Sequence, residues 1–207
     1  MIERVELVVR TIANTAIENE QYFSELDGVV GDGDFGCSLA RGFEKVLEEW
    51  DNLDRSNPGP FLTKVASVII GAVGGVSGAI WGTAFLRAGM SLGTKTEIEG
   101  PDAVALLRAA IEGIKKRGQS DVGDKTLLDA LVPAVDTLEK ALNEGKGPAG
   151  ALAEAATAAR TSAEGTRPMI AKRGRAAYTG ERSIGTLDAG AVAVAVMMEA
   201  VSQGWTK

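Results

Sequence analysis

Apolar residues recur every three or four positions along most of the chain, which is the spacing of one face of an α-helix. The first such stripe consists of Ile2, Val5, Val9, Ile12 and Ala16. Glycine and proline separate the stripes that follow. We therefore expect further helices over residues 38–50, from Pro60 to 74–75, over 77–93, over 101–118, from about Asp124 to 142, after Pro148, and from Asp188 towards Trp205.

The last of these segments needs a second argument, because A-V-A-V-A-V-M-M (191–198) also alternates as a β-strand does. Its length and the N-cap residue Asp188 before it favour a helix. The pattern thus predicts an all-α fold of about eight helices, in which short loops join antiparallel neighbours. No linker or shift in composition divides the chain, so we expect a single domain over residues 1–207.

One uncharged stretch, residues 65–86, is long enough to cross a bilayer. It contains five glycines, and the pair Gly74-Gly75 would interrupt a helix at its centre. Two helices joined by a loop are therefore expected rather than a membrane span. The chain starts with charged residues, Glu3 and Arg4 among them, unlike a signal peptide, so we expect a cytoplasmic protein.

The composition excludes several kinds of chemistry. Lys and Arg number 22 and Asp and Glu 28, and a net charge of −6 argues against a nucleic-acid partner. Cys37 is the only cysteine, so no internal disulfide can form, which suits a reducing cytoplasm, and we expect it to be a small buried residue. The chain has no histidine and therefore no Ser-His-Asp triad, phosphohistidine or histidine-bound zinc. Any metal must be held by oxygen.

Three carboxylates, Asp27, Asp32 and Asp34, lie in the glycine-rich stretch L-D-G-V-V-G-D-G-D-F-G (26–36). Their charges repel and ordering the glycines costs entropy, so the cluster indicates a bound cation. The EF-hand pattern fits poorly, since glycine takes its third acidic position and no glutamate closes the loop. Mg²⁺ held by carboxylates and substrate phosphates fits better. A solvated Asx/Gly turn is the alternative.

Three other segments, also punctuated by glycine, suit the binding of an anion. G-G-V-S-G (74–78) precedes a helix whose N–H groups and dipole favour phosphate, although it is not a Walker A loop and close helix packing explains its glycines equally well. G-D-K-T-L-L-D (123–129) offers Asp124 as an N-cap and is equally consistent with a plain capped helix. K-R-G-R-A-A-Y-T-G-E-R-S-I-G (172–185) is basic, and is either a phosphate-neutralising loop or a solvated connector. Together the four segments suit phosphoryl transfer.

Taken in order, these segments resemble the L subunit of bacterial dihydroxyacetone kinase, equivalent to the nucleotide-binding domain of single-chain dihydroxyacetone kinases. The resemblance rests on G-D-G-D-F-G, G-G-V-S-G, G-D-K-T and G-R-A-A-Y-T-G-E-R-S-I-G and covers essentially the whole chain. It implies a barrel of eight antiparallel helices, with ADP or ATP bound among the loops at one end. It also implies that Asp27, Asp32 and Asp34 hold two Mg²⁺ ions, which bind the nucleotide phosphates.

The same resemblance implies the other site residues. Arg175 matches the arginine that neutralises phosphate, and with the three aspartates it forms the expected catalytic set. The expected nucleotide contacts are Phe35, Ser38, Val76 and Ser77 at the phosphates, and Gly118, Thr126, Leu127, Asp188, Ala189 and Gly190 around the adenine and ribose.

The chain departs from the family pattern close to the expected nucleotide. The family usually has His where Phe35 stands, Asn where Ser38 stands, and G-G-A-S-G-P rather than G-G-V-S-G-A. It usually has His-Gln-Asp-Pro-Gly over residues 186–190, so that Thr186 and Ala189 also differ. The three aspartates and Arg175 are intact, and we therefore expect a divergent branch that retains the metal chemistry.

The function that this resemblance implies is that of a phosphotransferase subunit. In the family, a K subunit holds the ketose on its own histidine, and the L subunit delivers the phosphoryl group to dihydroxyacetone or a related short ketose. In one branch an M subunit of the phosphotransferase system rephosphorylates bound ADP, and in another ATP is consumed. The alternatives are an ATP kinase domain for another acceptor, such as a tetrose ketose or a protein-bound fatty acid, and a nucleotide-loaded regulatory protein.

Overall fold

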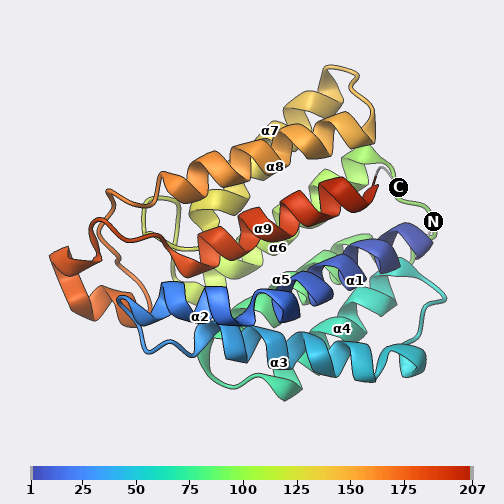
Figure 1. Ribbon diagram of the computed structural model, residues 1–207. Helices are drawn as coiled ribbons and strands as arrows, with labels where there is room; N and C mark the ends of the chain where they lie inside the picture. Colours follow the sequence, from blue (N-terminus) through green and yellow to red (C-terminus); the bar gives the residue numbers. More distant parts are fainter. Residues whose placement is uncertain (1, 206–207) are drawn as a thin grey trace.

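The computed structural model describes residues 2–205, which are all-α, with nine α-helices, two 3₁₀-helices and no strand in that range (Figure 1). The α-helices are α1 (Ile2–Glu18), α2 (Glu20–Gly28), α3 (Phe35–Glu48), α4 (Pro58–Ala72), α5 (Gly75–Leu92), α6 (Gly100–Gly118), α7 (Leu128–Asn143), α8 (Pro148–Glu164) and α9 (Ala189–Trp205). The 3₁₀-helices are η1 (Trp50–Asn52) and η2 (Arg175–Ser183). The all-α prediction is confirmed, and the alternating segment within α9 is a helix.

Eight of the helices close into a ring. α1 packs against α3 and α3 against α4, and the ring continues through α5, α6, α7 and α8 to α9, which packs back on α1. Neighbours in the ring run antiparallel (Figure 1). The predicted antiparallel barrel of eight helices is thus confirmed. α2 is an additional helix that the sequence pattern did not predict, and it packs mainly against α3 and α9.

Because the ring helices alternate in direction, every second connection lies at the same end of the barrel, here called the loop end. The connections at the loop end are α2–α3 (29–34), α4–α5 (73–74), α6–α7 (119–127) and α8–α9 (165–188). The α2–α3 and α8–α9 connections are seen at the left of Figure 1. The four segments singled out in the sequence therefore lie at one end of the molecule.

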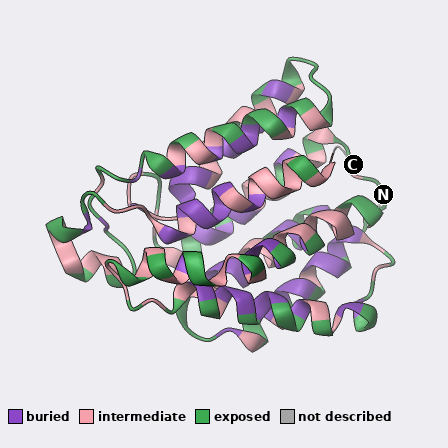
Figure 2. Cartoon of the chain, viewed as in Figure 1, coloured by how far each residue is buried: buried purple, intermediate pink, exposed green. Residues whose placement is uncertain are grey.

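The helices turn their apolar sides to the interior of the ring, where these side chains form the core. Figure 2 shows the buried residues along the helices in purple. In one part of the core, the ring of Phe43 meets the rings of Trp81 and Phe85 edge-on, with centroids 6.5 and 6.0 Å apart. α8 contributes a stripe of small buried side chains, which lets it lie close to α7 and α9: Ala151, Ala155, Ala159 and Ala163.

The uncharged stretch over residues 65–86 forms two helices, as expected, because α4 ends at Ala72 and α5 begins at Gly75. The two helices approach closely through glycine, and a Cβ on Gly89 would lie 2.7 Å from the carbonyl oxygen of Gly59. Among residues 2–205, no helix combines the length and the apolar character needed to cross a membrane.

Four helix starts differ by two or more residues from the predicted ones. They are Phe35 rather than Ser38 for α3, Pro58 rather than Pro60 for α4, Gly75 rather than Ser77 for α5, and Leu128 rather than about Asp124 for α7. The first three predictions were late because a first helical turn does not need an apolar stripe. The prediction for α7 was early because the carboxylate of Asp129 holds the preceding residues in a loop, so Asp124 is not the N-cap.

Candidate functional site

The three aspartates of the acidic segment converge at the loop end. Asp27 lies in the last turn of α2, and Asp32 and Asp34 lie in the α2–α3 connection. One carboxylate oxygen of each residue lies within 4.8 Å of those of the other two. Asp27 is half-buried, whereas the other two are exposed. This set of hard oxygen donors fits Mg²⁺, which prefers such ligands.

Glycines build the loop that gathers these carboxylates. The N–H of Gly31 donates to the carbonyl oxygen of Asp27 at 2.6 Å, and the N–H of Gly33 donates to Asp27 Oδ2 at 2.9 Å. Gly33 has a φ of +75°, which favours glycine. A Cβ on Gly31 would overlap Asp27 Oδ1. The glycine spacing seen in the sequence is therefore required by the tight wrapping of the backbone around Asp27.

The start of α3 is pressed against α2. A Cβ on the buried Gly36 would overlap the carbonyl oxygen of Glu20. The ring of Phe35 packs against that of Phe23, with centroids 6.2 Å apart, so its side chain belongs to the core. Ser38 is half-buried in the first turn of α3. Only main-chain groups of Phe35 can donate to a phosphate, since a phenyl ring has no such donor.

Cys37 is exposed, so the prediction that it is a buried residue was wrong. It lies in the first turn of α3, where its backbone N–H is 3.3 Å from Ser24 Oγ and its Sγ is 3.8 Å from Arg41 Nη2. The neighbouring Gly36 takes the inward position on α3, which turns Cys37 outward.

Arg175 brings the basic segment to the acidic cluster. It is the first residue of η2, and its guanidinium forms an ion pair with Asp32 Oδ2 while Nη2 lies 3.8 Å from Asp34 Oδ2. The side chain remains 63% exposed. The predicted catalytic set is thus brought together in space, and Arg175 lies where an anion bound to the same cluster would meet it.

Buried Asp129 organises the α6–α7 connection, and the sequence reasoning did not single it out. Its carboxylate accepts the N–H of Gly123 at 2.5 Å and that of Thr126 at 2.7 Å. This holds Leu127 next to α9, where a Cβ on Gly190 would lie 3.3 Å from Leu127 Cβ. Thr126, Leu127 and Gly190, which are three of the predicted adenine and ribose contacts, therefore lie together.

Asp188 is the N-cap of α9, as predicted, because its Oδ2 accepts the N–H of Ala191 at 2.7 Å. Ala189, in the first turn of α9, is buried. The pKa of Asp188 is raised to about 7, chiefly by burial and also by the carboxylates of Asp129 and Asp27, although the N–H of Ala191 and the ammonium of Lys125 act in the opposite direction. Asp27, a member of the acidic cluster, therefore lies close enough to Asp188 to affect its pKa.

The remaining predicted contacts lie at the start of α5 and the end of α6. Val76 and Ser77 are in the first turn of α5, where Val76 is 69% exposed. Gly118 is the last residue of α6, and a Cβ on it would lie 3.2 Å from Ile80 Cδ1, one turn further along α5. These three residues are thus near neighbours at the loop end.

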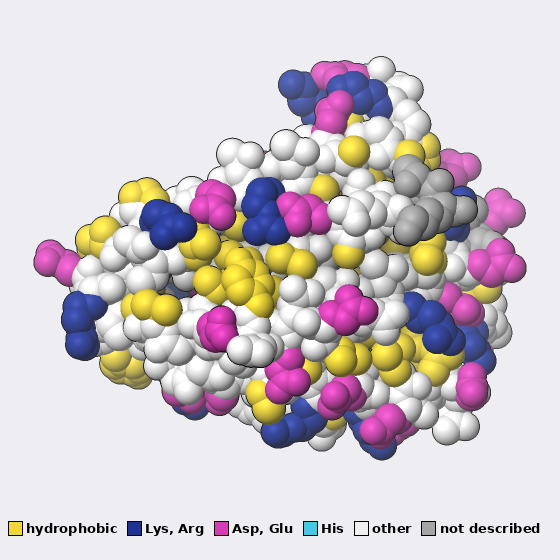
Figure 3. Space-filling view, in the orientation of Figure 1, with side chains coloured by type: hydrophobic (Ala, Val, Ile, Leu, Met, Phe, Trp, Pro, Cys, Tyr) yellow, Lys and Arg dark blue, Asp and Glu magenta, His cyan; other side chains and the backbone are white. Residues whose placement is uncertain are grey.

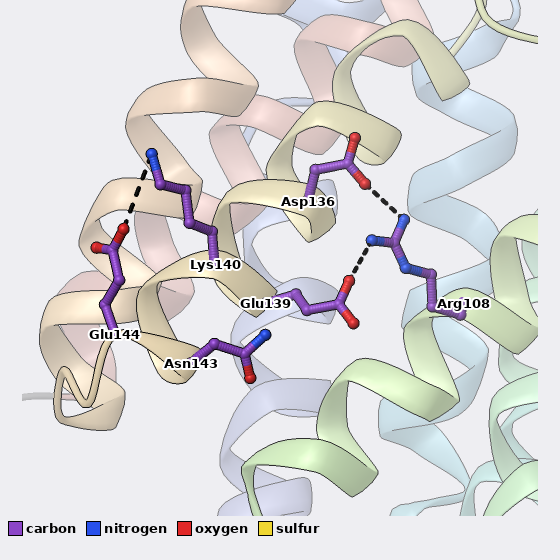
Figure 4. A pocket seen from close by; sticks show the side chains of 6 residues that line it. All are labelled: Arg108, Asp136, Glu139, Lys140, Asn143 and Glu144. Carbon is purple, nitrogen blue, oxygen red and sulfur yellow. Dashed lines mark hydrogen bonds and ion pairs between the residues drawn. The ribbon is translucent and has the colours of Figure 1, made fainter.

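A surface hollow of about 420 Å³ lies away from these residues, between α6 and α7. In Figure 4, Arg108 points towards Asp136 and Glu139, to which its nitrogens are 2.6 and 2.5 Å distant, and Lys140 lies 3.8 Å from Glu144. The cations of this hollow are neutralised by its own carboxylates. We therefore place the functional site at the loop end.

The chain is similar to known proteins along most of its length. The model of the DAK2 domain family matches residues 29–203. The PEP-dependent dihydroxyacetone kinase, ADP-binding subunit DhaL, of Escherichia coli is 35% identical over 179 residues, which are 86% of this chain and 85% of the relative. The L-erythrulose 1-kinase of Mycolicibacterium smegmatis is 37% identical over 206 residues, which are 97% of this chain but 35% of that protein.

Solved structures have the same fold. The dihydroxyacetone kinase of C. freundii in its native form superposes with a TM-score of 0.74 and 26% identity, covering 98% of this chain and 34% of that one. Its complex with AMP-PNP and Mg²⁺ gives a TM-score of 0.72. The chain therefore belongs to the DAK2 family and is a phosphotransferase subunit of the dihydroxyacetone and erythrulose kinase type.

Proposed function

We propose that this chain binds ADP or ATP through two Mg²⁺ ions held by Asp27, Asp32 and Asp34, and transfers a phosphoryl group to dihydroxyacetone, or a related short ketose, on a partner K-type subunit. The observation that carries the proposal is the meeting of the three carboxylates with Arg175. This arrangement combines a cation-binding surface with an arginine, and phosphoryl transfer uses both.

The orientation of the helices also favours the binding of an anion at the loop end. α3, α5, α7 and α9 all begin at the loop end, so four helix N-termini lie at the same end of the molecule as the acidic cluster. Helix N-termini attract anions, and those of α3, α5 and α9 carry the expected phosphate and nucleotide contacts. The acidic cluster alone would repel a nucleotide, and the helix ends oppose that repulsion.

Each residue then has a defined task. Bound Mg²⁺ would supply the charge that neutralises the nucleotide phosphates. Arg175 would exchange its carboxylate partners for the oxygens of the transferred group, on which negative charge is spread. The acceptor hydroxyl is itself the nucleophile, so the chain needs no histidine or other nucleophilic side chain. Catalysis consists of positioning and electrostatic stabilisation.

Exposed apolar side chains at the loop end support the docking of a partner subunit. Tyr178, in η2, is 91% exposed, and the set is completed by Val29, Val76, Val122, Ile170 and Ile184. Figure 3 shows apolar side chains between the charged ones at the left end of the molecule. Apolar surface around a polar site is typical of protein interfaces.

The names of the relatives indicate which phosphoryl donor and which acceptor substrate are the best candidates. The DhaL subunits of Escherichia coli and Lactococcus lactis are named as PEP-dependent and PTS-dependent, which favours a phosphorylated M-type protein as the donor. The relative from Mycolicibacterium smegmatis is an L-erythrulose 1-kinase, so a ketotetrose is the second candidate acceptor.

A reconstituted transfer reaction tests the proposal. The chain is loaded with ADP and Mg²⁺ and mixed with a K-type subunit and dihydroxyacetone or L-erythrulose, and either ATP or a phosphorylated M-type protein is added. We expect a phosphorylated ketose with at least one donor, and no product with Asp32→Ala. If every combination fails although the chain binds ADP, the protein is a nucleotide-loaded binding protein and not a transferase.

A further inference from the structure

Lys125 joins two connections of the loop end through a buried ammonium group. The residue is 2% exposed, which is rare for a lysine. Its Nζ donates to the backbone carbonyls of Met169, Ser183 and Thr186, over 3.1, 2.5 and 2.8 Å, and lies 3.3 Å from Thr186 Oγ1. Lys125 belongs to the α6–α7 connection, whereas all its acceptors belong to the α8–α9 connection. One side chain therefore ties the two loops together.

The backbone at Lys125 is held in a conformation that lysine rarely adopts. Its φ is +61°, in the left-handed region. Asp129 accepts the N–H groups of Gly123 and Thr126 on either side and so fixes this turn. Strained backbone persists only where the surrounding contacts impose it. The turn and the carbonyl groups thus act together to aim the ammonium inward.

Asp124, the preceding residue, makes a second attachment to the α8–α9 connection. Its carbonyl oxygen accepts the N–H of Lys172 at 3.0 Å. Its carboxylate lies 3.4 Å from Lys172 Nζ and 3.2 Å from Arg173 Nε. Burial would raise the pKa of Asp124, but the N–H of Asp121 and these two cations outweigh it, so its pKa lies below the ordinary value and the attachment is ionic.

The two attachments lie on either side of Arg175. Asp124 holds residues 172–173 before it, and Lys125 holds residues 183–186 at the end of η2. Between them η2 carries Arg175 to Asp32 and Asp34. The position of the guanidinium is therefore set by the base of the loop as well as by the aspartates.

We propose that Lys125 is a positioning residue for Arg175: its ammonium fixes the base of the α8–α9 connection so that the guanidinium is held at the acidic cluster. The inference rests on the function proposed above for Arg175. Removal of the ammonium takes a donor from the part-buried carbonyl groups of Met169 and Thr186, whereas that of Ser183 keeps the hydroxyl of Thr186, and the loop must open to hydrate the carbonyl groups that lose their donor.

Hydrogen exchange tests the structural half of this inference without any ligand. Amide exchange is measured by mass spectrometry in Lys125→Met, with Lys116→Met, an exposed lysine of α6, as the matched control. We expect exchange over residues 169–186 to become about tenfold faster in Lys125→Met and to stay unchanged in α3 and in the control. Equal exchange in Lys125→Met and the parent would overturn the inference. If circular dichroism shows that Lys125→Met does not fold, Lys125→Gln, which keeps two donors, replaces it.

A double-mutant cycle tests the functional half. The affinity for AMP-PNP in Mg²⁺ is measured by calorimetry for the parent, Lys125→Met, Arg175→Ala and the double variant, because this nucleotide, unlike ADP, carries a group in the place of the phosphoryl group on which Arg175 is proposed to act. If Lys125 acts through Arg175, Lys125→Met weakens binding about tenfold in the parent and has almost no effect once Arg175 is absent. Independent losses that multiply in the double variant would overturn the inference. An Arg175→Ala variant that binds as the parent does would remove the proposed role of Arg175, while the exchange experiment still decides whether Lys125 orders the loop.

Discussion

Asp188 gives folding a pH dependence opposite to that of an ordinary carboxyl group. Burial raises its pKa from 3.8 to about 7, so the folded protein keeps the proton that the unfolded chain releases near pH 4. The resulting stabilisation is complete below about pH 4 and is lost as the pH rises through 7. A difference of about three pH units corresponds to roughly 4 kcal/mol of unfolding free energy.

The substitution Asp188→Asn isolates this effect. The amide oxygen can still accept the N–H of Ala191 and cap α9, but the side chain no longer titrates. Urea unfolding is followed by circular dichroism at intervals from pH 4 to pH 8 for the parent and the variant. We expect the variant to gain stability relative to the parent as the pH rises, by up to about 4 kcal/mol near pH 7, and to keep a constant advantage above it.

Asp51, whose side chain is 97% exposed on η1, provides the control. The difference in the free energy of unfolding between Asp51→Asn and the parent should not increase in this way between pH 4 and pH 8. A constant difference between Asp188→Asn and the parent from pH 4 to pH 8 would refute the reasoning, because it would mean that the carboxyl of Asp188 titrates alike in the folded and unfolded chains.

Two further predictions concern the loops that build the site. Asp129→Ala leaves the N–H groups of Gly123 and Thr126 without an acceptor and should lower the free energy of unfolding by about 3 kcal/mol in urea titrations, and a loss below about 1 kcal/mol would contradict the role given to Asp129. Gly36→Ala forces a Cβ against the Glu20 carbonyl and to 2.6 Å from Ser24 Oγ, and should cost about 2 kcal/mol by the same assay. Gly71→Ala in α4, where a Cβ meets nothing within 4 Å, is its matched control and should stabilise the protein.

The ring helices were predictable because each has an apolar face over several turns, whereas α2 was not. α2 follows α1 after a break of one residue, and Phe23 is its only buried residue among those described. A helix of nine residues with a single buried side chain shows no periodic stripe. The packing of α2 depends on its close contact with α3 at Gly36. A contact between two helices cannot be read from the hydrophobic pattern of either one.

The acidic cluster could be recognised from the sequence because its carboxylates and glycines are local. The supports of the site could not, since they join distant segments. The segment G-D-K-T-L-L-D suggested Asp124 as a helix cap, but Asp129 holds that loop and Asp124 faces Lys172 and Arg173. A lysine looks like a surface residue in any sequence, and only the carbonyl groups of a loop more than forty residues away explain the burial of Lys125.

One departure from the family pattern has a physical explanation in the structure. The family usually has a polar histidine where this chain has Phe35, and that ring packs against Phe23 beneath the acidic loop. An apolar side chain there adds to the core that supports the loop. The structure gives no reason for Thr186 beyond its contacts with Lys125, and none for Ala189.

The most direct test of the account is the binding of ADP to the chain by calorimetry, with Mg²⁺ and with EDTA. The parent is compared with Asp32→Ala and with Asp51→Ala, which removes an exposed carboxylate in η1, beyond the end of α3 that lies away from the acidic cluster. We predict binding that requires Mg²⁺, is lost in Asp32→Ala and is kept in Asp51→Ala, with circular dichroism unchanged in all three. Equal affinity of Asp32→Ala and the parent for ADP in Mg²⁺ would contradict the assignment of the acidic cluster as the metal and nucleotide site.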